Sequence, residues 1–345
     1  MRIFFSFRRI DRIGEFKKVQ YGNFVVFLPT DSPIVSFTLK TTVLMGRHTF
    51  SEWFTATRYW SFPVSTMPVV ATFAYLFSEG LIPSGPKPYA VLALSLLAVV
   101  CLHSAGNLLS DYYDYKRGVD NERAFAVPFL VHHKFEPKEY LVFSVVLFAV
   151  GALLGIVITL LSGPGLLLVG GAGIILTVLY SFLKYRALGD LDIFVIFGVL
   201  TVLGSSYAMT GEFVWNALVL SVPIGIITVA VLHANNTLDI HSDKEAGIRT
   251  FAMILGARTS CVLYCIYMIL PFAAVVAAVF MGMLHPLSLL CVVAALPAGK
   301  NFSRAASYNR QGLEAIKGLD RDSAKLQLVF SGLLSLGLIL GPLVF

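Results

Sequence analysis

The chain has 345 residues, of which 57% are apolar and 13% are charged, and its formal net charge at pH 7 is +6. A soluble domain carries about 25% charged residues, so this composition excludes an ordinary soluble globule, and the low polarity excludes a disordered chain. The mean hydropathy of +0.79 indicates a protein that is mostly embedded in a lipid bilayer.

Residues 1–44 differ from the rest of the chain. They are mixed, basic and rich in Phe, and they contain no run that could span a membrane. We interpret them as an atypical N-terminal extension and expect 45–345 to form one transmembrane domain. Met45 opens a more ordinary start, so we hypothesise that it is the true initiator and that 1–44 extends an upstream reading frame. A targeting peptide is the alternative, but the apolar core and small-residue cleavage site of such a peptide are missing.

Apolar runs of about 20 residues, the length that crosses a bilayer as a helix, fill the remainder of the chain. The predicted fold class is therefore all-α, a polytopic membrane protein with nine transmembrane helices. The nine spans are expected at about 61–78, 88–109, 140–162, 164–183, 191–209, 213–237, 260–281, 283–299 and 326–345.

The basic residues test this count independently. With nine spans, 25 of the 26 Lys and Arg residues fall on one side of the membrane, and only Lys87 falls on the other. Cytoplasmic loops carry an excess of Lys and Arg, so this partition predicts a cytoplasmic N-terminus and a C-terminus outside. We expect a multi-pass protein of the cell (inner or plasma) membrane.

The fourth span contains the segment GGAG at 170–173. A glycine-rich phosphate loop follows a strand, and no strand precedes this segment, so a phosphate loop is excluded. Small residues in membrane helices commonly allow two helices to approach closely, and we expect that packing role here.

Carboxylates are concentrated where two spans emerge at the cytoplasmic side. Residues three or four apart share one face of a helix. Two stripes have the same composition, an amide followed by two carboxylates at this spacing: Asn107, Asp111 and Asp114 after the second span, and Asn235, Asp239 and Asp243 after the sixth.

Two facing acidic pairs repel each other unless a cation lies between them. Hard oxygen ligands suit Mg²⁺, which takes one or two carboxylates together with substrate phosphates. A single acidic pair at a helix end is more often solvated, whereas two such stripes on one membrane face favour a metal and diphosphate site. Basic residues that could bind phosphate are nearby: Lys116, Arg117, Lys184, Arg186, Lys244 and Arg249.

Four segments carry a resemblance to a known family: TRYWSFPVSTMPV at 57–69, NLLSDYYDYKRGVD at 107–120, YSFLKYRALGD at 180–190 and NNTLDIHSDKEAGIRT at 235–250. Over residues 57–345 the chain resembles the UbiA superfamily of intramembrane aromatic prenyltransferases. The closest similarity is to the 1,4-dihydroxy-2-naphthoate polyprenyltransferase branch. The first motif departs from the superfamily pattern, because Ser110 stands where Asn usually precedes the first Asp and Gly118 stands at its last Asp.

The resemblance implies a UbiA-type helical bundle and a Mg²⁺-dependent reaction, with two ions. A polyprenyl group would pass from polyprenyl diphosphate to 1,4-dihydroxy-2-naphthoate with loss of the carboxylate, giving a demethylmenaquinone for menaquinone biosynthesis. Lys184 would contact the diphosphate, and Tyr180 would lie near the allylic carbon, with Tyr112 or Tyr113 as further aromatic candidates. The implied metal ligands are Asp111 and Asp114 for one ion and Asp239 and Asp243 for the other. The implied substrate contacts are Asn107, Asn235, Asn236, Arg58, Arg249 and Asp120.

Other functions stay open at this point. Within the family, the acceptor could be 4-hydroxybenzoate, homogentisate, haem or a chlorophyll precursor. From a different class, a cation transporter could use the same carboxylates, although a carrier usually places them near the membrane midplane. A CDP-alcohol phosphotransferase is disfavoured because its DGxxAR signature is absent from the sequence. We expect no nucleic-acid partner.

Overall fold

The structure is a computed structural model, and it describes residues 10–13, 16–21, 24–29, 48–119 and 129–344. The chain divides into two compact units, Met1–Thr55 and Ala56–Phe345. Met45 lies outside the described residues, so the hypothesis about the initiator stays a prediction.

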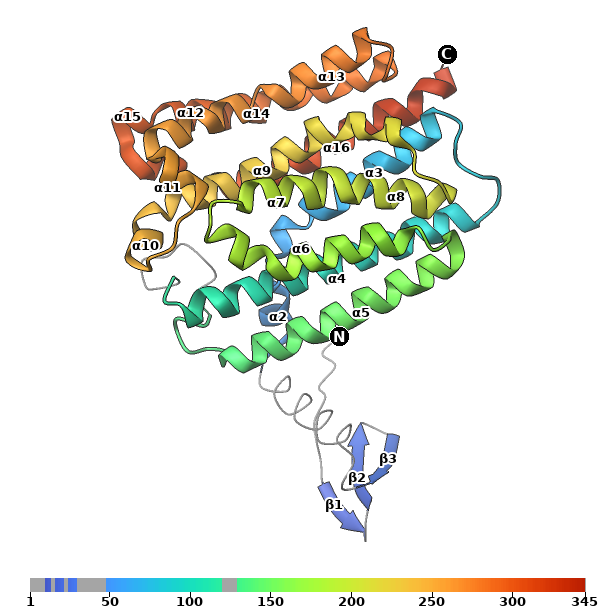
Figure 1. Cartoon of the computed structure of the whole chain (residues 1–345), viewed down its shortest axis with the longest axis vertical. Coiled ribbons are helices and arrows are strands. Elements are labelled where there is room, and N and C mark those ends of the chain that lie inside the picture. The colour runs from blue at the N-terminus through green and yellow to red at the C-terminus, as the bar shows by residue number, and fades with distance from the viewer. Residues whose placement is uncertain (1–9, 14–15, 22–23, 30–47, 120–128, 345) are drawn as a thin grey trace. The chain divides into compact units, whose positions relative to one another are not determined.

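The first unit contains a small antiparallel sheet. Its strands are β1 (Ile10–Ile13), β2 (Phe16–Tyr21) and β3 (Phe24–Pro29), in the order β1-β2-β3. Neighbouring strands are antiparallel in both pairs (Figure 1). These strands are too short to cross a membrane. The short helix α2 (Phe50–Ala56) follows.

The second unit is a helical bundle. In the part of the chain that the structure describes, nine helical stretches are long and apolar enough to cross a membrane, which confirms the predicted all-α polytopic fold. They are η1 and α3 (Tyr59–Ser61, Pro63–Ser78), α4 (Lys87–Lys116), α5 (Pro137–Ser162), α6 (Leu166–Lys184), α7 with η2 and α8 (Gly189–Ile193, Phe194–Leu200, Thr201–Thr210), η3 with α9 (Trp215–Leu220, Ser221–Leu238), α12 with α13 (Ala257–Tyr267, Leu270–Phe280), η4 with α14 (Pro286–Ala294, Ala295–Ala306) and α16 (Leu319–Val344). Short helices lie between them: α10 (Ile240–Glu245), α11 (Phe251–Leu255), α15 (Tyr308–Gln311) and η5 (Gly312–Ile316).

Helix ends differ from the predicted ends where polar motifs begin. The second span was expected to end at about 109, but α4 continues to Lys116. The reason is that Asp111 and Asp114 are buried inside the protein, so loss of hydrophobicity does not mark the helix end. The sixth span, in contrast, ends close to its expected end at about 237. Helix α9 ends at Leu238, and Asp239 separates it from α10.

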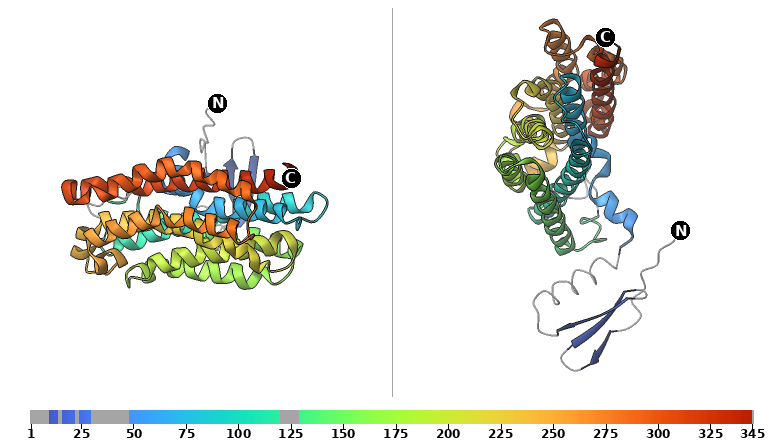
Figure 2. Two further views of the ribbon diagram at one scale, coloured as in Figure 1. Left: turned by 90° about the horizontal axis from the view of Figure 1, so that it is seen from above. Right: turned by 90° about the vertical axis from the view of Figure 1, so that its right-hand side faces the viewer.

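The last helix closes the bundle. Helix α16 packs against α3, α9 and η4, so the end of the chain lies beside its first and middle spans (Figures 1 and 2). A Cβ atom on Gly337 would lie 2.1 Å from the backbone oxygen of Leu287. Only glycine therefore permits this approach of α16 to η4, as small residues do in other membrane helix pairs.

The glycines of the GGAG segment do not have the packing role that we expected. A Cβ atom on Gly170, Gly171 or Gly173 would meet nothing within 4 Å, so no neighbouring helix requires a glycine there. The expectation was wrong because sequence shows which helices carry small residues but not which of those residues meet a neighbour. These glycines instead line a cavity.

Candidate active site

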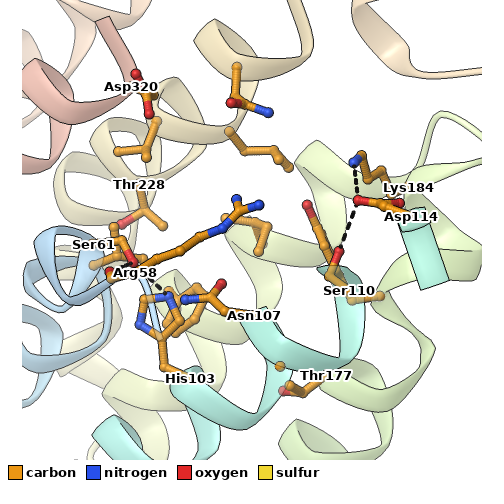
Figure 3. Close-up of a pocket in the computed structure, with 18 of the residues that line it drawn as sticks. Arg58, Ser61, His103, Asn107, Ser110, Asp114, Thr177, Lys184, Thr228 and Asp320 are labelled. Carbon is orange, nitrogen blue, oxygen red and sulfur yellow. Dashed lines mark hydrogen bonds and ion pairs between the residues drawn. The ribbon is translucent and has the colours of Figure 1, made fainter. Parts of the chain in front are cut away.

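A cavity of about 130 Å³ lies among the motif residues. Its lining comes from η1, α3, α4, α6, α7, η2, α9, α10 and α16, so segments from the first and the last helices of the bundle form it (Figure 3). The structure brings eight of the residues expected from the sequence to this lining: Arg58, Asn107, Asp114, Tyr180, Lys184, Asn235, Asp239 and Asp243.

On α4, the first carboxylate is held by an arginine from the start of the bundle. Arg58 Nη2 donates to Asp111 Oδ1 at 2.5 Å, and Asp111 is only 2% exposed. Arg58 has a φ of 57°, in the left-handed region that a residue with a side chain rarely adopts. Such backbone strain is found at functional sites, where the surrounding structure maintains it. Asn107 supports the same region because its Nδ2 donates to the backbone oxygen of Thr57 at 3.0 Å.

The second carboxylate of α4 has three partners. Lys184 Nζ lies 3.0 Å from Asp114 Oδ2, and the hydroxyl of Tyr185 donates to Asp114 Oδ1 at 2.5 Å. Ser110, which departs from the superfamily pattern, donates to Asp114 Oδ2 at 3.5 Å (Figure 3). These contacts attach the end of α6 to the end of α4. They also place the ammonium group of Lys184 next to the acidic motif.

The second acidic motif is built around a helix break. Asp239 separates α9 from α10, yet its backbone N–H still donates to Asn235 O at 3.0 Å, and the N–H of Asp243 donates to Asp239 O at 2.8 Å. The expected stripe is therefore retained across the break. Asn235 Nδ2 donates to Asp239 Oδ2 at 3.0 Å, which leaves the amide of Asn235 beside the carboxylate as predicted.

Asp243 lies in a strongly acidic environment. It is 1% exposed, and burial raises its pKa to about 7, while Lys184 opposes the rise and the charges of Asp239 and Asp114 add to it. A divalent cation beside it would replace this repulsion by attraction and would favour the ionised carboxylate.

The oxygen donors in this region fit a divalent cation that is coordinated partly by the protein and partly by a substrate. Three buried oxygens in this region accept no hydrogen bond within the described part of the chain: Asp111 Oδ2, Asn236 Oδ1 and Asp243 Oδ2. All are hard oxygen donors of the kind that Mg²⁺ prefers. Among the described residues no three His, Cys, Asp or Glu side chains converge on one point, so the protein offers pairs of ligands rather than a closed cage. Phosphate oxygens and water could complete such a shell.

Some expected residues lie elsewhere. Arg249 is exposed and outside the lining, and its backbone N–H donates to Tyr185 O at 3.2 Å. Asn236 is buried but does not reach the lining. Tyr112 and Tyr113 contact each other edge to face outside it, which leaves Tyr180 as the lining residue among the three aromatic candidates. Asp120 lies outside the described residues.

Tyr185 is a functional candidate that the sequence did not single out. It follows α6, so its position next to Asp114 depends on how the chain turns after Lys184. Burial, followed by the charge of Asp114 and the hydrogen bond to it, raises the pKa of Tyr185, so the hydroxyl stays protonated and donates. Arg117 lies 4.7 Å from the centre of its ring and holds the ring from the other side.

We expect Tyr185→Phe to weaken metal use without abolishing the reaction. Partners that orient metal ligands typically contribute about 10- to 100-fold to metal affinity, so the Mg²⁺ concentration for half-maximal activity should rise by about that factor. A Mg²⁺ titration of prenyl transfer measures it. Tyr113→Phe, outside the lining, is the matched control, and an unchanged Mg²⁺ requirement in Tyr185→Phe would contradict the assignment.

A buried hydrogen-bonded pair of side chains lies behind the second motif. His233 Nδ1 is 2.6 Å from Asp190 Oδ2, and the two side chains are 0% and 9% exposed. Asp190 lies in the first turn of α7, after the turn that follows Lys184, and His233 precedes Asn235 on α9. The pair therefore connects α7 to the helix that carries Asn235.

Breaking this pair should destabilise the protein. His233→Asn leaves the buried carboxylate of Asp190 without its partner, and such a loss costs about 3–5 kcal/mol of unfolding free energy. Denaturation of the purified protein in detergent measures the change. His132→Asn in the exposed 129–136 loop is the control and should be neutral, and equal stability of the two variants would show that the pair has no structural role.

A fourth carboxylate lines the cavity and comes from the last helix. Asp320, in the first turn of α16, is part of the lining together with Trp60 and Ser61. Figure 3 shows it apart from the Lys184–Asp114 pair, with Arg58 between them. The neighbouring Arg321 lies 4.7 Å from the centre of the Trp60 ring. Asp320 thus lies apart from the Lys184–Asp114 pair within the same cavity.

Comparison with known proteins identifies the family of the chain. Residues 66–317 match the UbiA prenyltransferase family. The chain is 32% identical over 304 residues to the UbiA prenyltransferase domain-containing protein 1 of Mus musculus, which covers 86% of each chain. It is 32% identical over 295 residues to the protein of the same name from Homo sapiens, which covers 83% of each.

Solved structures show the same fold. A UbiA homologue from Aeropyrum pernix K1 superposes with a TM-score of 0.61 at 18% identity, covering 82% of this chain and 98% of the other. A UbiA homologue from Archaeoglobus fulgidus, solved bound to GPP and Mg²⁺, gives a TM-score of 0.50 at 14% identity, covering 82% and 99%. The chain belongs to the UbiA prenyltransferase family and is a polytopic membrane prenyltransferase.

Proposed function

We propose that the protein transfers a polyprenyl group from polyprenyl diphosphate to an aromatic acceptor in a Mg²⁺-dependent reaction. The observation that carries the proposal is one cavity in which the Asp114–Lys184 pair faces Asp239 and Asp243. The relatives are named for a prenyltransferase domain, and the Archaeoglobus fulgidus homologue is described as bound to GPP and Mg²⁺.

The metal would be held by the four motif carboxylates. Asp111 and Asp114 would serve one ion and Asp239 and Asp243 the other, with Asn235 and Asn236 beside them. The unpartnered oxygens of Asp111, Asp243 and Asn236 support this assignment. When bound, Mg²⁺ neutralises charge that develops on the departing diphosphate.

The protein groups bind, orient and exclude water. Lys184 exchanges its contact with Asp114 for the diphosphate, since an ammonium binds phosphate as a point charge. Tyr180 lines the cavity four residues earlier on α6, one helical turn from Lys184, and its ring face can stabilise the allylic cation that forms as the carbon–oxygen bond breaks. The apolar wall of η2 limits water that would otherwise trap that cation.

The acceptor is placed on the opposite side, near Trp60, Ser61 and Asp320. There the aromatic ring can stack, and Asp320 can accept a hydrogen bond from an acceptor hydroxyl, which makes the ring more electron-rich. The ring carbon then bonds to the allylic cation that remains after the carbon–oxygen bond to diphosphate has broken. We propose 1,4-dihydroxy-2-naphthoate as acceptor because of the KYRALGD segment at 184–190. In that case the carbon–carboxylate bond breaks, CO₂ departs, and its electron pair restores the aromatic ring.

The site is proposed to face the cytoplasm in a cell membrane. With nine spans, 25 of the 26 Lys and Arg residues fall on one side of the membrane. This supports a cytoplasmic N-terminus and a C-terminus outside. Both acidic motifs and Lys184 lie at the ends of spans that emerge on that side. The diphosphate head group would then enter from the cytoplasm while the tail stays in lipid.

The test is a membrane assay with labelled polyprenyl diphosphate, Mg²⁺ and separate acceptors. We expect a prenylated, decarboxylated naphthol from 1,4-dihydroxy-2-naphthoate, and EDTA should abolish it. Product from 4-hydroxybenzoate or homogentisate alone would overturn the proposed acceptor but keep the reaction. Absence of product from every acceptor, together with ion flux in liposomes that lack donor, would overturn the reaction in favour of a transporter.

A further inference from the structure

One ionisable side chain of the cavity has no part in the reaction proposed above. His103 lies on α4, one helical turn before Asn107, and it lines the candidate active site. Ionisable residues inside membrane helices are rare and commonly functional. Figure 3 shows the His103 ring beside Ser61 and away from the Lys184–Asp114 pair. The ring therefore lies on the side of the cavity where the acceptor is proposed to bind.

Two hydroxyl groups determine which ring nitrogen carries the proton. His103 Nδ1 is 3.0 Å from Ser65 Oγ, and Nε2 is 3.3 Å from Ser61 Oγ. Ser65 donates its one hydroxyl hydrogen to Phe62 O at 3.2 Å, and Ser61 donates its own to Arg58 O at 2.7 Å. Because Ser65 Oγ is left as an acceptor, Nδ1 is the donor of the neutral ring, and Nε2 keeps its lone pair.

The protein satisfies this lone pair only weakly. The 3.3 Å separation from Ser61 Oγ is long for a hydroxyl donor, whose ordinary distance is about 2.7–2.8 Å. Neither ring nitrogen contacts a carboxylate in the part of the chain that the structure describes. Phe62 and Phe197 contact the ring, with centroids 6.2 and 5.3 Å away. An imidazole that is held in place and presents a lone pair to a cavity is suited to take a proton from a bound substrate.

We propose that His103 is the general base of the reaction: Nε2 takes the proton of the acceptor hydroxyl next to the carbon that is prenylated, and Ser65 positions the ring. The inference rests on the proposed function. An aromatic hydroxyl fits this role because it donates to Nε2, and because loss of its proton makes the ring carbon more nucleophilic. The second hydroxyl of a 1,4-dihydroxy ring is left for Asp320.

The step balances without a further reactant. As the O–H bond breaks, its electron pair forms a carbonyl, a ring electron pair bonds the adjacent carbon to the allylic cation, and the proton passes to Nε2. That adjacent carbon now carries both the prenyl group and the carboxylate. The carbon–carboxylate bond then breaks, CO₂ departs, and its electron pair restores the aromatic ring while the oxygen takes the proton back. His103 is thereby returned to its initial state.

The experiment is a cycle that combines a change in His103 with a change in the acceptor hydroxyl. The protein variant is His103→Asn, whose amide can still donate to Ser65 but cannot hold a proton. The altered acceptor is 1-methoxy-4-hydroxy-2-naphthoate, which lacks the hydroxyl proton next to the carboxylate. General-base catalysis contributes about 10²- to 10⁴-fold, so each change alone should lower kcat by at least about 10²-fold. Together they should cost at most about threefold more than either alone, because both remove the same proton transfer.

The other monomethyl ether is the matched acceptor control. 4-Methoxy-1-hydroxy-2-naphthoate keeps the relevant hydroxyl, so His103→Asn should still lose about 10²-fold with it. His132→Asn, in the exposed 129–136 loop, should match wild type with every acceptor. The KM for the donor should change by less than about threefold in His103→Asn, since Nε2 does not contact the diphosphate. Heat stabilisation by a prenyl thiolodiphosphate with Mg²⁺ shows that the variant is folded and binds the donor.

Two further variants distinguish a base from a group that only accepts a hydrogen bond. His103→Gln places an amide oxygen near the position of Nε2 but cannot hold a proton, so it should be as slow as His103→Asn. Ser65→Ala removes the hydroxyl that orients the ring and should lower kcat by about tenfold. This loss should disappear with the 1-methoxy acceptor, which a merely structural effect of Ser65 would not produce.

The outcomes separate the two proposals. Additive losses in the cycle, or wild-type kcat in either His103 variant, would overturn the assignment of the base, while turnover by wild-type protein would still support the proposed reaction. Wild-type protein that prenylates no phenolic acceptor would overturn the proposed reaction itself.

Discussion

Asp114→Asn is expected to reduce kcat/KM for prenyl transfer by about 10²- to 10³-fold, the effect of removing one preorganised electrostatic contact from a transition state. Asp114 lies at the centre of the site, where it contacts Lys184, Tyr185 and Ser110. Asparagine keeps the size of the side chain and removes the charge that a divalent cation needs. Initial rates at saturating and limiting Mg²⁺ measure the loss.

Two further variants make this result interpretable. Asp322→Asn is the control, because Asp322 is also paired, with Arg304 and Lys325, but lies outside the cavity lining. It should retain wild-type activity. Asp243→Asn should lose as much as Asp114→Asn, because Asp243 is a proposed metal ligand in the lining of the same cavity. Full activity in either motif variant would contradict the metal assignment.

Lys184→Met is expected to lower kcat/KM by about 10²-fold, because one preorganised cation no longer stabilises the departing diphosphate. Methionine retains the apolar stem that packs near Gly189 but not the charge. The KM for the donor should rise together with the fall in kcat, since the ammonium contacts diphosphate in both ground and transition states. Steady-state kinetics at varied donor concentration separate the two.

Lys184→Arg and Arg186→Met complete the comparison. Arginine restores the charge with different geometry, so Lys184→Arg should recover part of the lost rate. Arg186 belongs to the same basic segment but lies outside the lining, so Arg186→Met should change kcat by less than about threefold, as expected for an exposed charge. Equal losses in Lys184→Met and Arg186→Met would show that general positive charge, and not the position of Lys184, is what matters.

The sequence predicts the membrane fold well because apolar length and basic loops are one-dimensional signals. All nine spans are found in the described part of the chain, since each needs only about 20 apolar residues. The ends of the spans are harder to predict from the sequence. Asp111 and Asp114 continue α4 because protein covers them, whereas Asp239 ends α9, and hydropathy does not distinguish these situations.

The site is only partly predictable for a related reason. Asn107, Asp114, Asp239 and Asp243 follow from spacing along the chain, and the structure brings them to one cavity. Tyr185 contacts a residue 71 positions earlier, and the separation from His233 to Asp190 is 43, so neither contact has a local signal. Asp320 reaches the cavity only because α16 returns to the start of the bundle.

The glycines of GGAG illustrate the same limit. Small residues in a membrane helix predict close packing, but the space beside Gly170, Gly171 and Gly173 is open. Sequence reports the absence of a side chain and not what occupies the vacant volume. The interpretation therefore changes from a helix contact to the lining of a cavity once the neighbours of α6 are known.

The most direct test of the central claim is a crystal structure with Mn²⁺ in place of Mg²⁺ and a farnesyl thiolodiphosphate, with anomalous diffraction to locate the metal. The account predicts Mn²⁺ between the two acidic motifs, with oxygens of Asp114 or Asp111 and of Asp239 or Asp243 at about 2.0–2.3 Å and the diphosphate beside Lys184. Anomalous density away from both motifs, or a diphosphate bound without metal, would contradict it.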